Sequence, residues 1–451
     1  MAKHTSRRDI LKGVPAVAGG MLISANGPAL SAPRKPSTTG GSTLAPYRAF
    51  VRRSLTGAVE TITPKPLTGR QVAVRTQACF VDYSNARLVL DYARPVTVGG
   101  PPVGGGPRPT GMIPGDSNLG VVEAIGPQVQ SVNVGDRVVI AVTAECGRCH
   151  NCLRGRADRC ATFDSPAMEI ATLADGTPVV QQGGGGGKGG FAEMSIVNEE
   201  LCVPIFTDLP STELAILPCA GTTGLGLTMT LAPVDAGSNV VIFGAGPVGL
   251  SAVQGARIQG AHQIIVVEPI AARRKLALKV GATAAIDPNI DTDTLVPRLR
   301  EMCKGPTDRI FAGAAGSRSI GPDFVIEASG GDHFPPKAEK GPDPTGILAV
   351  QQAWDLCPPG GHLLTTAVGY PADAKVSFPA GIFTNGSKTL HSSQYGGSHS
   401  RRDIPRFVRL IEKGLFDAKS LVTSVYSLDQ IKEAHQETVD RTGIAGVITF
   451  A

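Results

Sequence analysis

Four cysteines of this chain lie close together in sequence and could bind a metal ion. They are Cys146, Cys149, Cys152 and Cys160, in the spacing C-x2-C-x2-C-x7-C. Four thiolates with this spacing can close tetrahedrally around one zinc ion, as they do in structural zinc sites. A disulfide cluster is the alternative, which the tight spacing disfavours because it strains disulfide pairing. The sequence therefore predicts a structural zinc lobe over residues 146–160.

A glycine-rich stretch in the middle of the chain could bind a dinucleotide. Residues 244–249 read G-A-G-P-V-G, directly after the apolar run 240–243 and directly before a helical pattern. In dinucleotide-binding units the first glycine permits a tight turn, the second admits the pyrophosphate, and the third allows close helix–strand packing. The free N–H groups at the helix start also bind phosphate. A lone G-x-G-x-x-G is weak, but the order strand, glycine turn, helix and strand is specific.

An acidic residue ends this unit and indicates which dinucleotide it binds. Glu268 follows the second apolar run, residues 264–267. A carboxylate here can accept hydrogen bonds from the adenosine ribose and would repel a 2′-phosphate, which favours NAD over NADP. Arg273 is a further candidate contact, and its positive charge weakens that preference. A ligand-free βαβ unit is the alternative. The predicted cofactor-binding residues are Gly244, Gly246, Pro247, Val248, Gly249, Glu268 and Arg273.

The elements that must position these residues fall into two groups. Closely spaced short strands, such as residues 121–126 and 136–140, indicate a small β-rich domain. After residue 239 strands alternate with helices, which predicts a doubly wound parallel sheet. The fold class is therefore α/β, with a β-rich domain and a Rossmann domain. Residues 307–346 are expected to be an insertion, and the glycine run 183–190 to be a mobile surface loop.

Length, composition and charge exclude several classes of function. The chain has 451 residues, of which 42% are hydrophobic and 18% charged, as in globular proteins of two or three domains. The formal net charge is +5, but residues 1–32 hold four basic residues and one acidic residue, a net +3, so only +2 remains elsewhere. A net charge this small does not indicate nucleic-acid binding. No apolar run of about 18 residues lies beyond the N-terminus, so no membrane span is expected.

The N-terminus has the features of an export signal. Arg7 and Arg8 precede an apolar pair and a lysine, and this stretch resembles the twin-arginine motif. A weakly hydrophobic segment rich in Gly, Ala and Val follows, and it ends in small residues before position 33. We therefore expect a twin-arginine signal peptide at 1–32, a linker at 33–43, and export through the Tat translocase to the periplasm or the cell exterior. A disordered basic tail is the alternative.

Further motifs surround the zinc lobe and the glycine turn. They are VGDRV at 134–138, GFAE at 190–193, PCAGTTG at 218–224, GAT at 281–283 and PGG at 359–361. With the four-cysteine lobe, they make residues 70–450 resemble the medium-chain zinc-dependent alcohol dehydrogenases. That resemblance implies a GroES-like catalytic domain at 44–220, a Rossmann domain at 221–393, and a return to the catalytic domain at 394–451. Members of this family usually form dimers or tetramers, so a homodimer or homotetramer is expected.

The resemblance also implies a second, catalytic zinc. The family holds this ion with Cys, His and Cys; the two cysteines match Cys79 and Cys219, while Asp116 stands at the histidine position. A carboxylate can ligate zinc, although the more anionic site is a weaker Lewis acid. Asp82 matches an aspartate that supports the ligands. The expected catalytic residues are therefore Cys79, Asp82, Asp116 and Cys219, and an Asp116→His variant is expected to keep the metal.

Other positions also depart from the family pattern, among them Phe80, which stands where a His or Arg often lies near the cofactor pyrophosphate. Val81 replaces a hydroxyl residue that relays the substrate proton, and Ala445 replaces an arginine that binds the cofactor phosphates. The sequence still favours an exported, zinc-dependent, NAD-linked dehydrogenase of an alcohol or aldehyde, with one structural and one catalytic zinc. A zinc-free enone or quinone reductase of the same superfamily is one alternative. A non-catalytic nucleotide-binding protein is the other.

Overall fold

The computed structural model describes eleven stretches of the chain. They are residues 44–53, 56–90, 110–164, 166–181, 188–289, 294–304, 320–330, 347–366, 375–378, 381 and 386–450. The expected signal peptide and linker, and most of the expected insertion at 307–346, lie outside the described residues. The predictions made for those segments therefore stay predictions.

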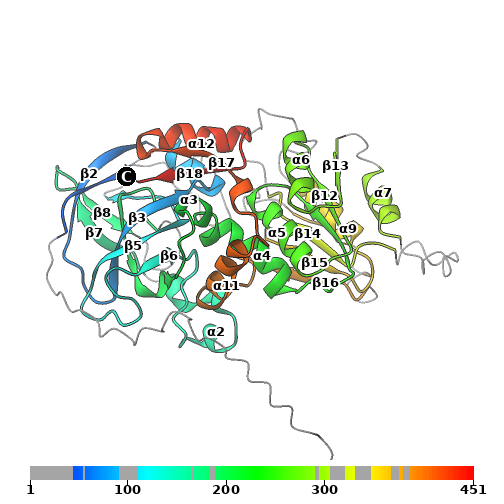
Figure 1. The fold of residues 1–451 in the computed structure, drawn as a ribbon, viewed down its shortest axis with the longest axis horizontal. Coiled ribbons are helices and arrows are strands. Elements are labelled where there is room, and N and C mark those ends of the chain that lie inside the picture. The colour runs from blue at the N-terminus through cyan, green and yellow to red at the C-terminus, as the bar shows by residue number, and fades with distance from the viewer. Residues whose placement is uncertain are drawn as a thin grey trace, which may run out of the picture. The chain divides into compact units, whose positions relative to one another are not determined.

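The β-rich domain contains a small closed barrel (Figure 1). Its strands follow one another in the order β1, β2, β7, β8 and β4. Alternate side chains point inward, as the two-residue period of a strand requires, and they fill a core that includes Val51, Ile62, Ile170 and Val179. The strands are β1 (Tyr47–Arg52), β2 (Gly57–Pro64), β4 (Gly111–Met112), β7 (Met168–Thr172) and β8 (Pro178–Gln181).

A seven-stranded sheet joins the start of this domain to the end of the chain. Its central strand β3 pairs with β5, with β9 and with the C-terminal strand β18, and Cys79 of β3 lies opposite both Asn118 and Ile448. The chain therefore returns to the β-rich domain after the Rossmann domain. The strands are β3 (Gln71–Phe80), β5 (Asn118–Ile125), β6 (Arg137–Ile140), β9 (Met194–Asn198), β10 (Cys202–Pro204), β17 (Val422–Tyr426) and β18 (Ala445–Thr449).

The Rossmann domain is built on a six-stranded parallel sheet, which confirms the predicted doubly wound fold. The strand order is β13, β12, β11, β14, β15 and β16, so the order reverses between β11 and β14. Ligands of such sheets bind outside the carboxyl ends of the strands at this reversal. The strands are β11 (Asn239–Phe243), β12 (Gln263–Val267), β13 (Ala284–Ile286), β14 (Phe324–Glu327), β15 (His362–Thr365) and β16 (Thr389–Ser392).

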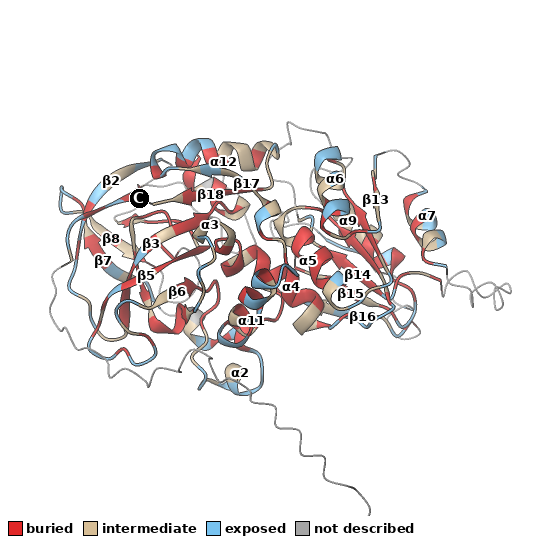
Figure 2. Ribbon diagram, in the orientation of Figure 1, coloured by how far each residue is buried: buried red, intermediate tan, exposed pale blue. Residues whose placement is uncertain are grey.

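Helices cover both faces of this sheet, because its strands are apolar on both faces. Val240 and Ile242 of β11 belong to one core cluster, while Val241 and Phe243 belong to another. Figure 2 shows the central strands β11, β12 and β14 as buried. Strands buried on both sides read as continuous Val/Ile runs, which explains why the sequence revealed them. The helices are α5 (Pro247–Ile258), α6 (Ala271–Val280), α7 (Leu295–Met302) and α9 (Ile347–Leu356).

The remaining helices connect and flank these sheets. Helix α11 buries Ile404, Phe407, Val408 and Ile411, a spacing that forms one apolar helical face. These helices are α1 (Ala86–Val89), α2 (His150–Leu153), α3 (Ser211–Leu214), α4 (Thr222–Gly226), α11 (Ser400–Glu412) and α12 (Ile431–Asp440). The short 3₁₀ turns are η2 (Tyr83–Asn85), η3 (Ala157–Arg159), η4 (Ala161–Asp164), η5 (Glu199–Leu201), η9 (Lys419–Leu421) and η10 (Leu428–Gln430). Two π-helical segments, η6 (Leu217–Gly221) and η7 (Leu227–Leu231), are continuous with α3 and α4.

One continuous helical stretch, Ser211–Leu231, is long and apolar enough to cross a membrane by length and composition. No apolar stretch of this length was expected beyond the N-terminus. In the structure, 78% of its apolar window is buried inside the protein. Core helices have the same property, so this stretch is weak evidence for a membrane span.

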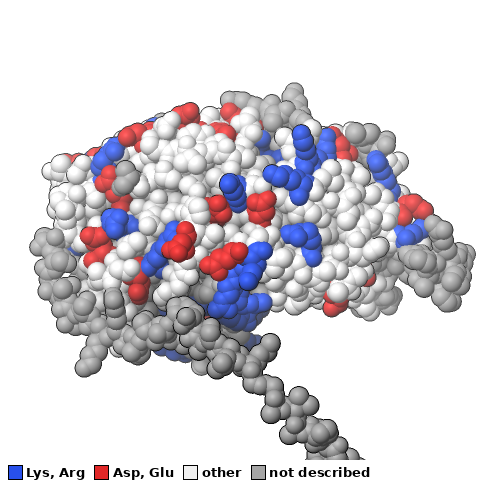
Figure 3. All heavy atoms as spheres, viewed as in Figure 1, with Lys and Arg blue, Asp and Glu red and all other residues white. Residues whose placement is uncertain are grey.

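Acidic and basic side chains are interspersed on the face shown in Figure 3. A group of basic side chains lies over α11, where Arg401, Arg402, Arg406 and Arg409 are exposed. The buried carboxylate of Asp403 pairs with two of these arginines. This distribution agrees with the small net charge outside the N-terminus.

Candidate active site and zinc lobe

The four cysteines of the predicted zinc lobe converge in the structure. The sulfur atoms of Cys146, Cys149, Cys152 and Cys160 all lie within 4.8 Å of one another. Nothing else in the described ranges brings three or more His, Cys, Asp or Glu ligand atoms that close. All four cysteines are free thiols, so the disulfide alternative is not the arrangement seen. The donor set fits a closed tetrahedral zinc site.

Backbone N–H groups around the lobe favour negative charge on sulfur. The N–H groups of Cys152 and Ala161 donate to Cys149 Sγ at 3.5 and 3.4 Å. The Ala161 N–H is the main cause that lowers the pKa of Cys149 to about 6. Burial raises the pKa of Cys152 to about 12 in the metal-free arrangement. A bound cation would favour the thiolate form of both cysteines, because metal coordination deprotonates a thiol.

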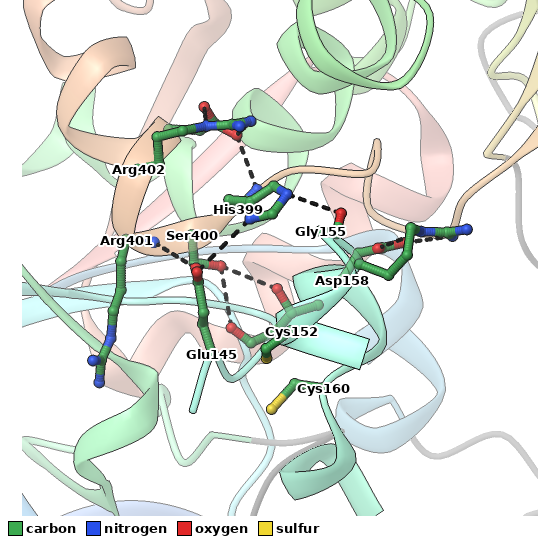
Figure 4. Close-up of polar contacts among 12 residues, drawn as sticks. Glu145, Cys152, Gly155, Asp158, Cys160, His399, Ser400, Arg401 and Arg402 are labelled. Atoms are coloured by element: carbon green, nitrogen blue, oxygen red, sulfur yellow. Dashed lines mark hydrogen bonds and ion pairs between the residues drawn. The ribbon is translucent and has the colours of Figure 1, made fainter. Parts of the chain in front are cut away.

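The lobe is tied to the segment that leads into α11 (Figure 4). Ser393 Oγ donates to Asp158 Oδ2 at 3.3 Å, and His399 Nε2 lies 3.0 Å from the carbonyl oxygen of Gly155. Asp158 and Ser393 are both buried. Loss of the lobe fold would therefore remove the partners of polar groups at the start of α11.

The four residues expected in the catalytic site lie together. Cys79 lies near the end of β3, Asp116 lies just before β5, and Cys219 lies in η6. Cys79 is buried and Cys219 is partly buried. Burial, followed by the charges of Asp82 and Asp116, raises the pKa of both thiols well above their ordinary value. The structure therefore places two thiols and two carboxyl groups in one cluster.

The carboxyl groups of this cluster are in different surroundings. Asp116 Oδ1 accepts a hydrogen bond from Asn85 Nδ2 at 2.9 Å. Asp82 Oδ2 is buried and has no hydrogen-bond partner. Burial and the neighbouring charge of Asp116 raise the pKa of Asp82 well above its usual range. A cation bound beside Asp82 would relieve this cost, because a buried negative charge is unfavourable unless a positive charge compensates it.

The residues therefore fit a metal ion by donor chemistry and by charge. Cys79, Cys219 and Asp116 supply two sulfurs and an oxygen, and zinc accepts all three donor types. Their ligand atoms are less tightly gathered than those of the four-cysteine lobe, which is the only described group that meets the 4.8 Å spacing. The assignment of a catalytic zinc to these three residues stays a prediction.

The glycine turn has the geometry that dinucleotide binding needs. Gly244 has φ = 93°, and a Cβ atom there would come within 2.9 Å of the Ser329 backbone. A Cβ at Gly249 would lie 2.0 Å from the Gly244 carbonyl oxygen. Helix α5 starts at Pro247, directly after the N-cap residue Gly246. Its free N–H groups therefore point at the reversal of strand order, where an anion would bind.

The two charged residues predicted to bind cofactor flank this turn. Glu268 is buried, and its two carboxylate oxygens accept the N–H groups of Ala245 at 2.7 Å and Ile270 at 2.9 Å. It thereby fixes the glycine turn. Arg273 Nη1 lies 4.0 Å from the position of a Cβ on Gly246. The structure thus brings the fingerprint, Glu268 and Arg273 together.

Comparisons with known proteins agree with this arrangement. Residues 68–207 match the alcohol dehydrogenase GroES-like domain, and residues 247–339 match the zinc-binding dehydrogenase family. Geraniol dehydrogenase of Castellaniella defragrans is 32% identical over 354 residues, which span 77% of this chain and 85% of that protein. The chain belongs to the medium-chain zinc-dependent alcohol dehydrogenase family. The NDMA-dependent alcohol dehydrogenase of Amycolatopsis methanolica is 28% identical over 340 residues, 75% of this chain and 84% of that protein.

A solved structure of the family shows the same fold. Benzyl alcohol dehydrogenase of Acinetobacter calcoaceticus superposes with a TM-score of 0.71 at 25% sequence identity. The match covers 90% of this chain and all of that one. The GroES-like and Rossmann folds expected from the sequence are therefore confirmed.

Val81 and Ala445, the positions expected to depart from the family pattern, are both buried. The N–H of Val81 donates to the carbonyl oxygen of Gly446 at 2.9 Å. Ala445 is fully buried at the start of β18. Burial lowers the pKa of Arg273. The like charge of Arg441, four residues before Ala445, lowers it further, so the two arginines lie near each other. Two arginines thus lie near the turn although Ala445 offers none.

Three residues near the candidate active site were not predicted from the sequence. Asn85 binds Asp116, and the charges of Asp116, Cys219 and Asp82 add to burial in raising the pKa of Tyr395. The third is Lys188. The glycine run around Lys188 was expected to be a mobile surface loop, and this was wrong for its described end, because residues 188–190 are buried. A glycine is required at position 190, because a Cβ atom there would lie 2.7 Å from Cys79 Sγ.

Proposed function

We propose that this family member is a zinc-dependent, NAD-linked dehydrogenase that interconverts an alcohol and its aldehyde or ketone. The cluster of Cys79, Asp82, Asp116 and Cys219 carries the proposal, because it supplies sulfur and oxygen donors beside the buried carboxyl group of Asp82, whose Oδ2 has no hydrogen-bond partner. Zinc held there would lower the pKa of a bound alcohol, and the nicotinamide would accept the hydride.

The chain's own residues orient and enclose the reaction. Cys79, Asp116 and Cys219 hold the ion, Asn85 fixes the Asp116 carboxylate, and the glycine turn with Glu268 presents the N-terminus of α5 to the pyrophosphate. Buried apolar side chains around Cys79 exclude water, which strengthens the electrostatic effect of each charge. Val81 cannot relay a proton, so the substrate proton leaves by another route.

The zinc-free enone or quinone reductase remains the second candidate. The ligand atoms of Cys79, Asp116 and Cys219 are less closely spaced than those of the four-cysteine lobe, and this favours the zinc-free candidate. Metal analysis of the purified protein separates the two functions. Two zinc ions per chain, with turnover of alcohols such as geraniol or benzyl alcohol, support the dehydrogenase. One zinc ion per chain, with turnover of enones or quinones alone, would support the reductase; no turnover with either substrate class would favour a nucleotide-binding role.

We expect the purified protein to retain NAD. An exported enzyme meets little free NAD, whereas a twin-arginine substrate crosses the membrane already folded. Arg273 lies beside Gly246, its buried Nε has no hydrogen-bond partner, and Arg441 adds a second positive charge nearby. A pyrophosphate would neutralise both charges. Denaturing the mature protein should release near-stoichiometric NAD, measured by enzymatic assay.

Arg273→Gln provides the matching variant. It is expected to weaken nucleotide retention roughly tenfold to a hundredfold, the usual effect of losing one charge-assisted hydrogen bond. Lys275→Gln removes an exposed charge of the same helix and should change nothing. An empty wild-type protein that needs millimolar added NAD would overturn the proposal of retention.

We also propose export by the Tat translocase, on the basis of Arg7 and Arg8. Replacing both arginines by lysine should leave the precursor in the cytoplasm, because the pathway reads the arginine pair. Fractionation and immunoblotting would measure this. Normal accumulation of the variant in the periplasm would show that residues 1–32 are not such a signal.

The expected homodimer or homotetramer can be measured on the same purified protein by light scattering.

A further inference from the structure

Cys219 lies in a turn whose backbone departs from a regular α-helix. The turn η6 is π-helical, and the N–H of Gly221 donates to the carbonyl oxygen of Ile216, five residues earlier, at 2.8 Å. Turns of this type are rare in proteins and appear frequently at functional sites. The position of the Cys219 thiol therefore depends on the contacts that hold this turn.

Thr222 is hydrogen-bonded on two sides of this turn. Its hydroxyl group donates to the carbonyl oxygen of Leu217, the first residue of η6, while Thr222 itself directly follows the last residue. The backbone carbonyl oxygen of Thr222 accepts the hydroxyl group of Ser398 at 3.2 Å. Thr222 and Ser398 are both buried. Their hydroxyl groups need these bonds, because a buried hydroxyl without a partner is costly.

The segment 396–398, which leads into α11, packs directly against α4 (Figure 1). A Cβ atom at Gly226 of α4 would lie 2.7 Å from the carbonyl oxygen of Gly396. Gly396 has φ = 68°, and a Cβ atom there would overlap the carbonyl oxygen of Thr223. Glycine is therefore required on both sides of this contact. The close approach of the two backbones brings the serine hydroxyl within reach of the helix.

The same segment is anchored to the zinc lobe and to the Rossmann sheet. The N–H of Gly397 donates to Ser393 Oγ at 2.8 Å, and Ser393 Oγ donates to Asp158 Oδ2 of the lobe at 3.3 Å. The N–H of Ser393 donates to the carbonyl oxygen of Thr365, the last residue of β15, at 3.2 Å. Ser398 thus extends toward α4 from a segment that is hydrogen-bonded to both domains.

We propose that Ser398 and Thr222 are positioning residues that fix the π-helical turn of Cys219, and with it the position of that thiol as a metal ligand. The inference rests on the proposed catalytic zinc at Cys79, Asp116 and Cys219. Residues that orient a metal ligand typically change metal affinity tenfold to a hundredfold when they are removed. Here the two residues act on the backbone that carries the sulfur.

Ser398→Ala tests the proposal, with Ser400→Ala as its matched control. Ser400 is buried to the same extent, but its hydroxyl group donates to the carbonyl oxygen of Thr143 at 3.1 Å. Two rates are measured: loss of the second zinc to a chelator, and alkylation of Cys219 after metal removal, resolved by mass spectrometry. Ser398→Ala should raise both rates roughly tenfold. Ser400→Ala should leave both unchanged, although it also loses a buried hydrogen bond.

Two variants of Thr222 test the second hydrogen bond. Thr222→Val removes the hydroxyl group while keeping the shape of the side chain, so it should raise the same two rates as Ser398→Ala. Thr222→Ser keeps the hydroxyl group and should retain the wild-type rates. Thr222→Val combined with Ser398→Ala should cost less than the product of the single effects, because both substitutions act on one turn.

The outcomes separate this inference from the proposed function. A wild-type protein with zinc in the lobe alone would overturn the proposed function, and with it the role of Ser398 at a metal site. Two zinc ions per chain, with equal rates of zinc loss and of Cys219 alkylation in wild type and Ser398→Ala, would overturn the inference and leave the function intact. Equal acceleration of alkylation at Cys219 and at Cys79 would indicate general loosening of the fold and would also overturn it.

Discussion

Replacing Asp116 by alanine is expected to remove the second zinc and to lower turnover roughly a thousandfold, since a metal ion supplies several kcal/mol of charge stabilisation. Asp116 is the only oxygen donor in the expected ligand set, and its loss leaves two thiols whose pKa is raised by burial. Zinc content and kcat/KM, measured on protein with its lobe zinc intact, check this prediction.

Two controls separate loss of the ligand from loss of the fold. Asp116→Asn keeps the side-chain shape while removing the charge, so its activity should fall almost as far as that of the alanine variant. Glu123→Ala removes a half-exposed carboxylate of β5 that pairs with Arg75 on the surface, and activity should not change. Unchanged kinetics in Asp116→Ala would defeat the assignment of Asp116 as a ligand.

The sites that the sequence reveals are those encoded locally. The zinc lobe depends on the spacing of four cysteines within fifteen residues, and the structure brings their sulfurs together. The glycine turn depends on six consecutive residues between a strand and a helix, and those elements form as expected. Each pattern fixes its own geometry, because a short loop leaves few ways to place the side chains.

The catalytic cluster is not encoded locally. Cys79, Asp116 and Cys219 come from β3, from the turn before β5, and from η6, and only the packing of these elements brings them together. Spacing along the chain cannot indicate such a group, so the sequence supplied it through family resemblance alone. The same limit explains Asn85, whose contact with Asp116 joins residues that no local pattern relates.

Lys188 was missed for a different reason. Its glycine neighbours have no side chains, and a glycine run is usually a flexible surface segment. Here the missing side chains allow a close approach, because Gly190 packs against Cys79 Sγ, and Gly189 and Gly190 are both buried. The glycine-rich composition predicted a flexible segment. In the structure, glycine at position 190 is instead explained by the lack of space for a side chain beside Cys79.

Replacing Cys149 by serine is expected to remove the lobe zinc and to destabilise the protein strongly. Cys149 Sγ accepts the backbone N–H groups of Cys152 and Ala161, and the bond from Cys152 caps α2. Cys149 therefore stabilises the fold of the lobe and also supplies a zinc ligand. Zinc in closed thiolate sites contributes about 10–16 kcal/mol of apparent binding free energy in small peptides, and that free energy is coupled to folding. The variant should lose one zinc ion per chain and melt at a markedly lower temperature.

The destabilisation should extend beyond the lobe, because Asp158 and Gly155 hold Ser393 and His399 at the approach to α11. Amide hydrogen exchange should therefore rise at the start of α11 as well as in residues 146–160. Cys303→Ser makes the same chemical change at a buried thiol of the Rossmann domain and should leave both zinc content and exchange at α11 unchanged. A Cys149→Ser protein with full zinc content and normal melting would show that the four cysteines do not form a structural zinc site.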